Sequence, residues 1–580
     1  MRDPLRQASL FAVGLFFLGW LGWQSGPPPR AESVRFEVFF PPSLHEAAVD
    51  GRVLLMLSTN GEEEPRFQIG TELDTQQVFG IDVEGLGPGE NAVIDDSTLG
   101  YPHKTLVDVP PGEYFAQALI NVYETFHRRD GHVLKLPMDD GEGQQWERSP
   151  GNLYSRPKRV SLDPSRGQTI RIELSEIIPP IDPPQDTRYI KHLRLQSKLL
   201  SEFWDRPMHL GAVVLLPEGF AEHPDTSYPV VYWHDHFQPS FTAGVGFREH
   251  PPEPELTGRA RQQAEYAYKL YQDWTSGRLP RMLLVIPQHP NPYYDDSYGV
   301  NSANLGPYGD ALVQELIPYV EKTFRGIGEP WSRALYGAST GGWIALAQQV
   351  FYPDFFNGSW CFCPDPVDFR AYQQVDIYQD VNAYWAESHW RRVPRIDRRE
   401  VNGDITAAME EANRLEMVLG TRGRSAGQWD VWQAVYSPLG ADGYPRPIYD
   451  KRSGLIDREV AVHWRERYDL RYILERDWKV LGPKLVGKVH VTVGDMDNYY
   501  LDRAVRLLEE FLESTQEPGR GPYYGGTIEY GDGRGHCYSG APSLPARVSA
   551  LTIHQRYLPL IAEHMLRTAP RGADVTGWRY

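Results

Sequence analysis

Short apolar runs separated by turn residues fill the early part of the chain. Between residues 34 and 176 they include VRFEVFF, GRVLLMLST, EYFAQALINVYETF and QTIRIELSEI. Such runs, bounded by Gly, Pro and Asp and nearly free of helical periodicity, are typical of β-strands joined by turns. The pattern predicts an all-β sandwich of immunoglobulin-like size over 31–176. The next segment, IIPPIDPPQD at 177–186, has four prolines and predicts a stiff linker.

Beyond the linker, strand-like runs alternate with helical stretches. Short apolar runs bounded by Pro, Gly or Asp, such as GAVVLLPEGF, YPVVYWHD, RMLLVIP, SRALYG, GSWCFCP and KVHVTVGD, are typical of strands buried on both faces. The stretch 308–324 repeats Leu312, Leu316, Val320 and Phe324 on one helical face, and its proline at 318 predicts a kink or a restart. The alternation predicts a doubly wound α/β sheet over residues 187–580.

One region interrupts this alternation. Residues 366–480 lack strand-like runs and are rich in Trp, Tyr, Arg and Glu. An insertion between two sheet strands commonly forms a cap over the functional end of the sheet. Its aromatic side chains are interpreted mainly as the insertion's own core, with a platform for sugar rings or aromatic acyl groups as the alternative.

Composition and charge exclude some classes of protein. The formal net charge is −18, so the electrostatic field of the chain repels polyanions and disfavours a nucleic-acid partner. The three cysteines, Cys361, Cys363 and Cys537, form neither a disulfide scaffold nor a CxxC or Cys/His zinc pattern. No cofactor-binding motif is present, so no cofactor and no metal are expected.

The first thirty residues have the pattern of an export signal. Two arginines precede the uncharged apolar run ASLFAVGLFFLGWLGW at 8–23, which GPPP follows. The residues after this run match the small-residue cleavage pattern poorly, so an uncleaved membrane anchor is the alternative to a cleaved signal. As a helix, this short run falls short of a bilayer core of about 30 Å. We therefore expect residues 1–30 to direct export to the periplasm or the cell exterior.

Two segments match the nucleophile pattern G-x-S-x-G, which is weak by itself. They are GASTG at 337–341 and GRSAG at 423–427. Only the first has a strand before it and a helix after it, the context that lifts a hydroxyl above a sheet edge and aims helix N–H groups at an oxyanion. Ser339 is therefore predicted to be a nucleophile, with a serine in a tight turn as the alternative, and Ser425 is not.

A serine needs a base, and an acid to orient that base. KVHVTVGDMDNYY is a strand that ends in a turn with Asp495 and Asp497, and IEYGDGRGHCYSG is a strand that runs into a glycine-rich loop with His536. The order Ser, Asp, His is that of α/β-hydrolases. Asp497 is favoured over Asp495 because it lies further into the loop, and Asp532 is a distant third candidate. The alternatives are turn-capping aspartates and a surface histidine.

The loop after YPVVYW carries His234, Asp235 and His236, where a second oxyanion donor is expected. A rival interpretation takes His234 and His236 as metal ligands, because residues two apart on a strand face the same way. No further cluster with metal-site spacing supports it.

These motifs, in this order, resemble the putative-esterase group of α/β-hydrolases. The group includes esterase D, feruloyl esterases, enterochelin esterase-like enzymes and mycolyltransferases. The resemblance covers about 211–365 and 488–538 and implies a triad of Ser339, Asp497 and His536. It also implies an oxyanion hole from the N–H of Thr340 and one from the loop that ends at His236. The family's usual His-Gly is HDH here. The early β-sandwich is similar to the leading domain of enterochelin esterase-like proteins.

The leading hypothesis is an exported serine hydrolase that cleaves small-molecule or carbohydrate-linked carboxylic esters. An acyltransferase, a peptidase, and an inactive hydrolase-fold protein that binds carbohydrate or a partner remain alternatives. The substrate-binding candidates are His234, Asp235, Tyr298 and Asn301, the last two in the polar loop DDSYGVNSANLGPYGD. If Cys363 and Cys537 both lie near the pocket, an oxidising compartment would link them; unpaired small hydrophobic residues are the alternative.

Overall fold

The computed structural model describes residues 34–237, 246–540 and 550–580. The predicted export signal, residues 1–30, lies outside these ranges. Within them, no helix combines the length and the apolar character needed to cross a membrane.

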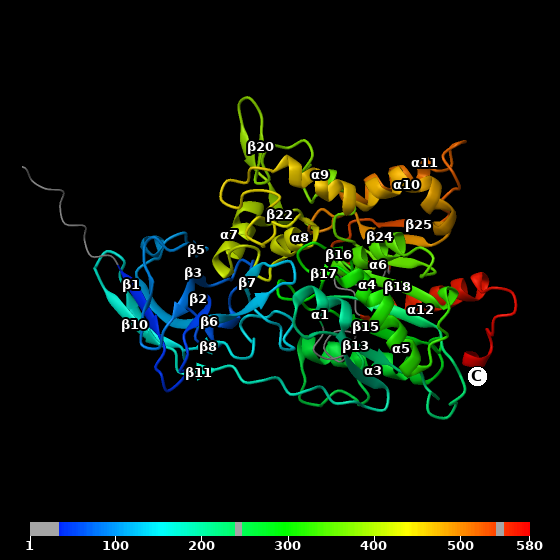
Figure 1. Cartoon of the computed structure of the whole chain (residues 1–580), viewed down its shortest axis with the longest axis horizontal. Helices are drawn as coiled ribbons and strands as arrows, with labels where there is room; N and C mark the ends of the chain where they lie inside the picture. Colours follow the sequence, from blue (N-terminus) through cyan, green and yellow to red (C-terminus); the bar gives the residue numbers. More distant parts are fainter. Residues whose placement is uncertain (1–33, 238–245, 541–549) are drawn as a thin grey trace, which may run out of the picture.

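Two β-sheets make up the N-terminal unit (Figure 1). One has the order β10-β1-β4, and the other has the order β11-β8-β6-β2-β3-β5, with β7 and β9 paired to β6. The strands are β1 (Arg35–Phe39), β2 (Val49–Ser58), β3 (Gln77–Leu86), β4 (Ala92–Ile94), β5 (Gly100–Tyr101), β6 (Gly112–His127), β7 (Val133–Leu136), β8 (Leu153–Tyr154), β9 (Lys158–Leu162), β10 (Thr169–Glu173) and β11 (Glu176–Ile177). Only two 3₁₀ turns, Pro65–Phe67 and Leu106–Asp108, are described among them.

The apolar run of β2 is continuous because both of its faces are buried. Val53, Leu55 and Leu57 pack into the core that also contains β1 and β10. Leu54 and Met56, which point to the other face, join a second cluster that includes side chains of the distant helix α7 (Met409–Leu419). Alternation along a strand thus places two neighbouring cores on opposite sides of one sheet.

The second large sheet has the order β12-β13-β15-β14-β18-β19-β24-β25. Numbered one to eight along the chain, these strands run 1-2-4-3-5-6-7-8. The second strand pairs antiparallel with both of its neighbours, and the other pairs are parallel. The strands are β12 (Ile190–Ser197), β13 (Met208–Leu215), β14 (Val230–His234), β15 (Leu283–Gln288), β18 (Arg333–Ala338), β19 (Ser359–Phe362), β24 (Val489–Gly494) and β25 (Thr527–Gly531).

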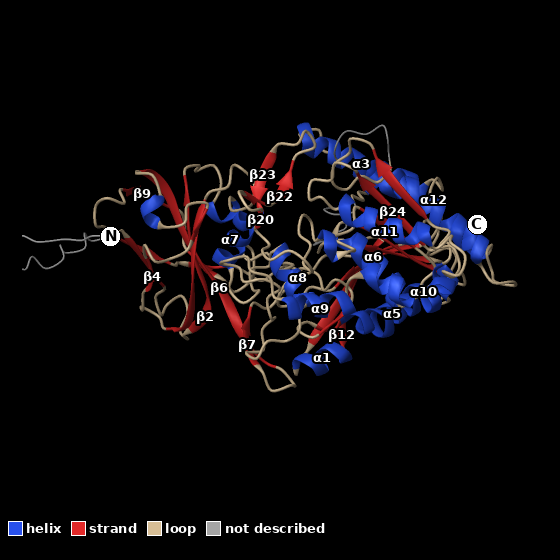
Figure 2. Ribbon diagram, turned by 90° about the horizontal axis from the view of Figure 1, so that it is seen from above, coloured by secondary structure: helices blue, strands red, loops and turns tan. Residues whose placement is uncertain are grey.

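Helices cover this sheet on both sides (Figure 2). Helices α3 and α12 pack on each other, as do α6 and α10, and Figure 2 shows the two pairs on opposite sides of the strands. The helices outside the insertion are α1 (Lys198–Trp204), α3 (Gly258–Thr275), α4 (Tyr308–Ala311), α5 (Ile317–Phe324), α6 (Thr340–Phe351), α11 (Asp502–Ser514) and α12 (Ala550–Thr568). The predicted helix 308–324 is broken by a π-helical segment, η3 (Leu312–Leu316), and restarts at α5 with Pro318 in its first turn.

The predicted insertion contains more strand than the sequence indicated. It has two short hairpins, β20 (Trp385–Glu387) with β21 (Arg392–Pro394) and β22 (Ile396–Arg399) with β23 (Ile405–Ala408). Strands of three or four residues are too short to show a periodicity. Helices α8 (Gln428–Tyr436), α9 (Arg458–Arg467) and α10 (Leu470–Leu485) follow α7.

Helix α10 packs on α6 and therefore belongs to the layer that covers the sheet. Helices α7 and α8, yellow in Figure 1, lie between the N-terminal sheets and the large sheet. Several insertion aromatics form a buried cluster of edge-on rings, as the core interpretation predicted: Tyr372, Trp429, Trp432 and Trp464.

Candidate active site

Ser339 occupies a sharp turn between β18 and α6. Its backbone has φ 55° and ψ −121°, a conformation that costs energy for a residue with a Cβ and that clusters at functional sites. The two glycines of the motif permit the turn. A Cβ on Gly337 would lie 2.5 Å from the carbonyl oxygen of His234, and a Cβ on Gly341 only 1.9 Å from the same atom. Strand β14, β18 and helix α6 therefore meet at van der Waals distance only because both positions lack a side chain.

The structure brings Ser339, His536 and Asp497 together. The Ser339 Oγ lies 3.0 Å from His536 Nε2, and His536 Nδ1 lies 2.8 Å from Asp497 Oδ2. The Asp497 side chain is fully buried, and its Oδ1 accepts hydrogen bonds from the backbone N–H groups of Tyr499 and Leu501. These bonds fix the carboxylate, which in turn fixes the imidazole.

The other two aspartates considered for this position do not contact His536. Asp495 Oδ1 accepts a hydrogen bond of 2.8 Å from the N–H of Gly533 and so braces the loop that carries the histidine. Asp532 is exposed in that loop. Asn498 supports the same loop, because its Oδ1 accepts the backbone N–H of His536 at 2.8 Å.

The charge state of His536 depends on its neighbours. Burial favours the neutral imidazole, but the Cys363 and Cys537 sulfurs and the Asp497 carboxylate favour the imidazolium and raise the pKa of His536. A base that holds its proton strongly can take one from a serine hydroxyl and stabilise the resulting ion pair.

The second G-x-S-x-G segment has no such arrangement. The buried Ser425 hydroxyl donates to Asp430 Oδ2 at 2.6 Å and accepts the N–H of Gly427 at 3.1 Å. Ser425 therefore ties down a turn before α8.

The turn that carries Ser339 lies in a part of the chain that matches a known protein family. Residues 202–418 match the family model described as Putative esterase. This part of the chain is similar to the putative-esterase family. The chain is a serine esterase, and the resemblance read from its motifs is confirmed. The match includes Ser339 but ends before Asp497 and His536, so the geometry alone connects these two residues to the serine.

No curated protein matches the chain. Among solved structures, a ferulic acid esterase is 16% identical, with a TM-score of 0.36 over 65% of this chain and 98% of that one. An S-formylglutathione hydrolase from Agrobacterium tumefaciens is 15% identical, with a TM-score of 0.35 over 66% and 98%. FphF, a fluorophosphonate-binding serine hydrolase of Staphylococcus aureus, is 13% identical, with a TM-score of 0.32 over 65% and 98%.

The oxyanion donors of this esterase remain predictions. Thr340 is the first residue of α6, where backbone N–H groups are free of helical partners. The N–H of His236 donates instead to the side chain of Asp235, at 2.8 Å from its Oδ1. The imidazole of His236 lies 3.1 Å from Asp295 Oδ2 and 3.9 Å from Asp296 Oδ2. Burial opposes its charge, but the two carboxylates raise the pKa of His236 to about 10.

A cavity of about 660 Å³ opens over Ser339. Asp235, one of the substrate-binding candidates, lines this cavity, and so does His236, the predicted oxyanion donor. The other three substrate-binding candidates, His234, Tyr298 and Asn301, are not part of its lining. Substrate binding by these three residues therefore stays a prediction. His234 ends β14 and turns into the core beside His289, and burial lowers the pKa of His234 to about 3. Because His234 and His236 have different neighbours, they do not form the rival metal pair.

Tyr298 and Asn301 act away from the cavity. Tyr298 is fully buried, with its backbone in the left-handed region at φ 57°, and its hydroxyl donates to Asp365 Oδ2 at 2.6 Å. Asn301 is exposed and exchanges hydrogen bonds with Asp310 in the first turn of α4. Side-chain directions in an irregular loop depend on such backbone values, which the sequence does not reveal.

Asp365 is a site residue that the sequence analysis missed. Its Oδ1 lies 3.4 Å from Ser339 Oγ, and its Oδ2 accepts from Thr340 Oγ1 at 3.1 Å as well as from Tyr298. Burial raises the pKa of Asp365. The carboxyl group holds the first turn of α6 beside Ser339. Its position just after the strand that follows the nucleophile helix was the only signal available.

The two cysteines near His536 are free thiols in this structure. The sulfurs of Cys363 and Cys537 and a ring nitrogen of His536 lie within 4.8 Å of one another. The expected proximity to the pocket is present, and a bridge in an oxidising compartment remains a prediction.

Proposed function

We propose that this esterase is an exported carboxylic ester hydrolase that forms an acyl-enzyme on Ser339. The observation that carries the proposal is the continuous chain of contacts from Ser339 Oγ through His536 to the buried carboxylate of Asp497, at 3.0 and 2.8 Å. The strand order of the large sheet fits an α/β-hydrolase, and so does the order Ser339, Asp497, His536 along the chain. Export rests on the apolar segment near the N-terminus.

The mechanism follows from these positions. His536 accepts the proton of Ser339 as the oxygen attacks the ester carbonyl, and Asp497 holds the imidazole in the required tautomer and stabilises its cation. The N–H of Thr340 at the N-terminus of α6 faces the developing oxyanion. His536 then donates the proton to the leaving alcohol, and water, activated by the same histidine, releases the acid.

The direct test is labelling by a fluorophosphonate probe, because this reagent requires an activated serine and no particular substrate. Ser339→Ala should lose the label and at least about 10³-fold of kcat toward p-nitrophenyl acetate. Ser425→Ala is the matched control, since it changes the serine of the same motif, and should still be labelled. Labelling that survives in Ser339→Ala and disappears in Ser425→Ala would refute the proposal.

Hydrolysis and acyl transfer share this triad and differ in the acceptor. Product analysis in the presence of added sugars and amines separates them, because only a transferase yields the new ester or amide in preference to the free acid.

A further inference from the structure

Three parts of the chain line the cavity over Ser339. The loops of the large sheet contribute the triad face, and α7 and α8 of the insertion contribute Leu415, Gln428 and Trp432. The N-terminal unit contributes the segment 144–147. Neither the triad nor the family match includes this last segment, which precedes the nucleophile by almost two hundred residues.

The segment 144–147 is held firmly at the cavity. The Trp146 carbonyl accepts from Asn152 Nδ2 at 2.8 Å, and the Glu147 carbonyl accepts from Arg66 Nη1 at 3.1 Å. Just before it, Gly143 has φ 70°, and a Cβ there would lie 2.4 Å from the ring of Phe237. Phe237 follows His236 directly, so the N-terminal loop packs against the loop predicted to supply an oxyanion donor.

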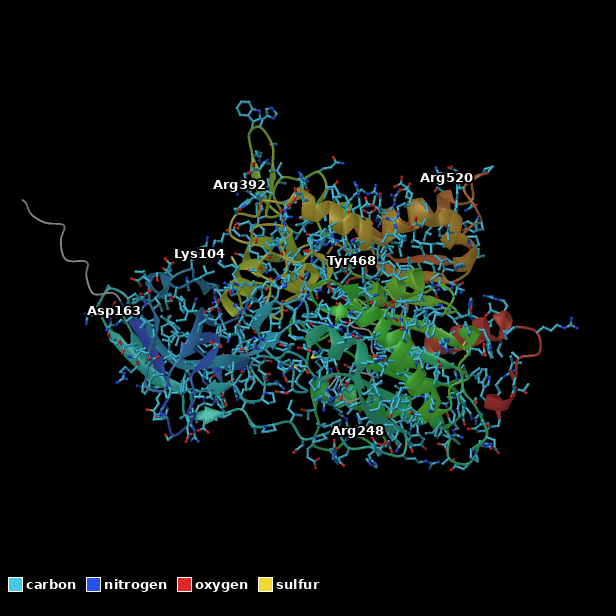
Figure 3. All side chains as sticks on the ribbon, viewed as in Figure 1. Lys104, Asp163, Arg248, Arg392, Tyr468 and Arg520 are labelled. Carbon is cyan, nitrogen blue, oxygen red and sulfur yellow. The ribbon has the colours of Figure 1, made fainter. Side chains whose placement is uncertain are left out.

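Helix α7 contacts both the N-terminal unit and the cavity, and Leu415 takes part in both contacts. Leu415 and Val418 are buried against Leu54, Met56 and other side chains of the N-terminal sheet. Residues Ala412, Leu415, Glu416 and Leu419 of the same helix line the cavity. The approach is close, because a Cβ on Gly80 of β3 would lie 2.1 Å from the carbonyl oxygen of Val418. At the rim of this contact, Lys104, labelled in Figure 3, lies 3.9 Å from Glu410 of α7.

The described cavity lining is acidic and aromatic. It contains five carboxyl side chains, no lysine and no arginine, and five large aromatic rings. The carboxyl groups belong to Glu147, Asp235, Asp365, Asp397 and Glu416, and the rings to Trp146, Trp233, Trp429, Trp432 and Tyr499. Apart from the triad histidine, the titratable base in this lining is His236, which Asp295 and Asp296 neutralise.

The carboxyl groups already resist ionisation. Burial raises the pKa of all five, even though Lys451 pairs with Glu416 and Arg148 lies 3.9 Å from Glu147 outside the lining. Another anion in this space would meet the five carboxyl groups, and the described lining has no lysine or arginine to pair with it, whereas a cation or a neutral ring would meet carboxyl groups and aromatic faces.

We propose that residues 144–147 of the N-terminal unit are specificity-determining residues of the esterase site, and that this site selects esters with a neutral or cationic ring at the end distant from the ester bond. Trp146 contacts that ring, and Glu147 favours positive over negative charge on it. The inference rests on the proposed function, because it requires Ser339 to attack an ester in this cavity.

The experiment compares four p-nitrophenyl esters: the acetate, the phenylpropanoate, and the phenylpropanoate with either trimethylammonium or carboxylate at the para position of its ring. In the parent enzyme, kcat/KM for the ammonium ester should exceed that for the carboxylate ester at least about tenfold. Trp146→Ala should lower kcat/KM for the phenylpropanoate about tenfold more than for the acetate, which is too short to reach the far wall. Trp146→Phe, which keeps a ring, should recover most of the difference.

Glu147→Gln tests the charge. It should reduce the preference for the ammonium ester over the carboxylate ester at least about threefold. Glu113→Gln, on an exposed position of β6, should leave that preference as in the parent.

Each part of the inference has its own refutation. A carboxylate ester hydrolysed as fast as the ammonium ester overturns the charge selection. A Trp146→Ala enzyme that loses the same factor on the acetate and on the phenylpropanoate overturns the binding role, because a purely structural defect affects both equally. Failure of the proposed function has a different result: the parent enzyme would not react with a fluorophosphonate.

Discussion

Replacing Gly341 by alanine tests the close approach that shapes the nucleophile turn. The new Cβ would lie 1.9 Å from the carbonyl oxygen of His234, 2.5 Å from its carbon and 3.0 Å from the nitrogen of Asp235. All three neighbours are backbone atoms, so no side-chain rotation relieves the contact. Since Cβ contacts below 3.0 Å essentially do not occur, the start of α6 and the end of β14 must separate by at least about 1 Å.

This displacement acts on catalysis more than on folding. It moves the N–H of Thr340 away from the loop that ends at His236, and a misplacement of about 1 Å can cost about 10²-fold in rate. Overpacking of this kind destabilises by about 1–3 kcal/mol, which a large domain tolerates. We therefore expect Gly341→Ala to fold with a lower melting temperature and to lose about 10²-fold of kcat toward p-nitrophenyl acetate.

The assay needs steady-state kinetics and thermal unfolding of the same preparation. Gly70→Ala is the matched control, because a Cβ there has no neighbour within 4 Å, and it should match the parent in both measurements. If Gly341→Ala keeps kcat within twofold and an unchanged melting temperature, β14 and α6 do not approach as described and the reasoning fails.

Two further predictions concern charged groups. Asp497 helps to raise the pKa of His536, so Asp497→Asn should move the acidic limb of the kcat/KM profile to lower pH. The same substitution should reduce kcat about 10³-fold to 10⁴-fold, and kinetics measured across a range of pH values tests both effects. An acidic limb that stays in place or moves to higher pH contradicts this role. Arg333 and Glu321 form a buried bidentate pair with contacts of 2.7 and 2.9 Å, so Arg333→Ala should cost about 3–5 kcal/mol of unfolding free energy in urea. Replacing both residues by methionine should restore most of that loss, and a double variant as unstable as the single one would speak against the pair.

The features that could be predicted from the sequence are those that local pattern specifies. A strand, a glycine-flanked serine and a helix follow one another within residues 333–351, so the nucleophile turn needs no distant information. Asp497 and His536 each follow a strand of a parallel sheet, and the carboxyl ends of parallel strands meet at one edge. That rule brings side chains from three parts of the chain together.

The features that could not be predicted depend on packing between distant segments. Asp365 is held in place partly by Tyr298, 67 positions earlier, whose hydroxyl donates to its carboxyl group. The rival interpretation placed His234 and His236 on one face, but β14 ends at His234, so strand alternation does not continue to the second histidine. The N-terminal loop that lines the cavity carries no catalytic motif.

Helix α7 illustrates why the wall of this cavity has no signature in any one stretch of sequence. The last carbonyl groups of a helix lack partners within it and need donors from elsewhere. At the end of α7, the guanidinium of Arg52 supplies them, with Nη2 at 2.8 Å from the Met417 oxygen and Nε at 2.9 Å from the Val418 oxygen. Arg52 lies on β2, is almost fully buried, and also pairs with Asp82 at 3.2 Å. A cation at this end also complements the helix dipole. The N-terminal unit therefore terminates a helix that belongs to the insertion. Because the same helix also lines the esterase cavity, the shape of the cavity depends on both units at once.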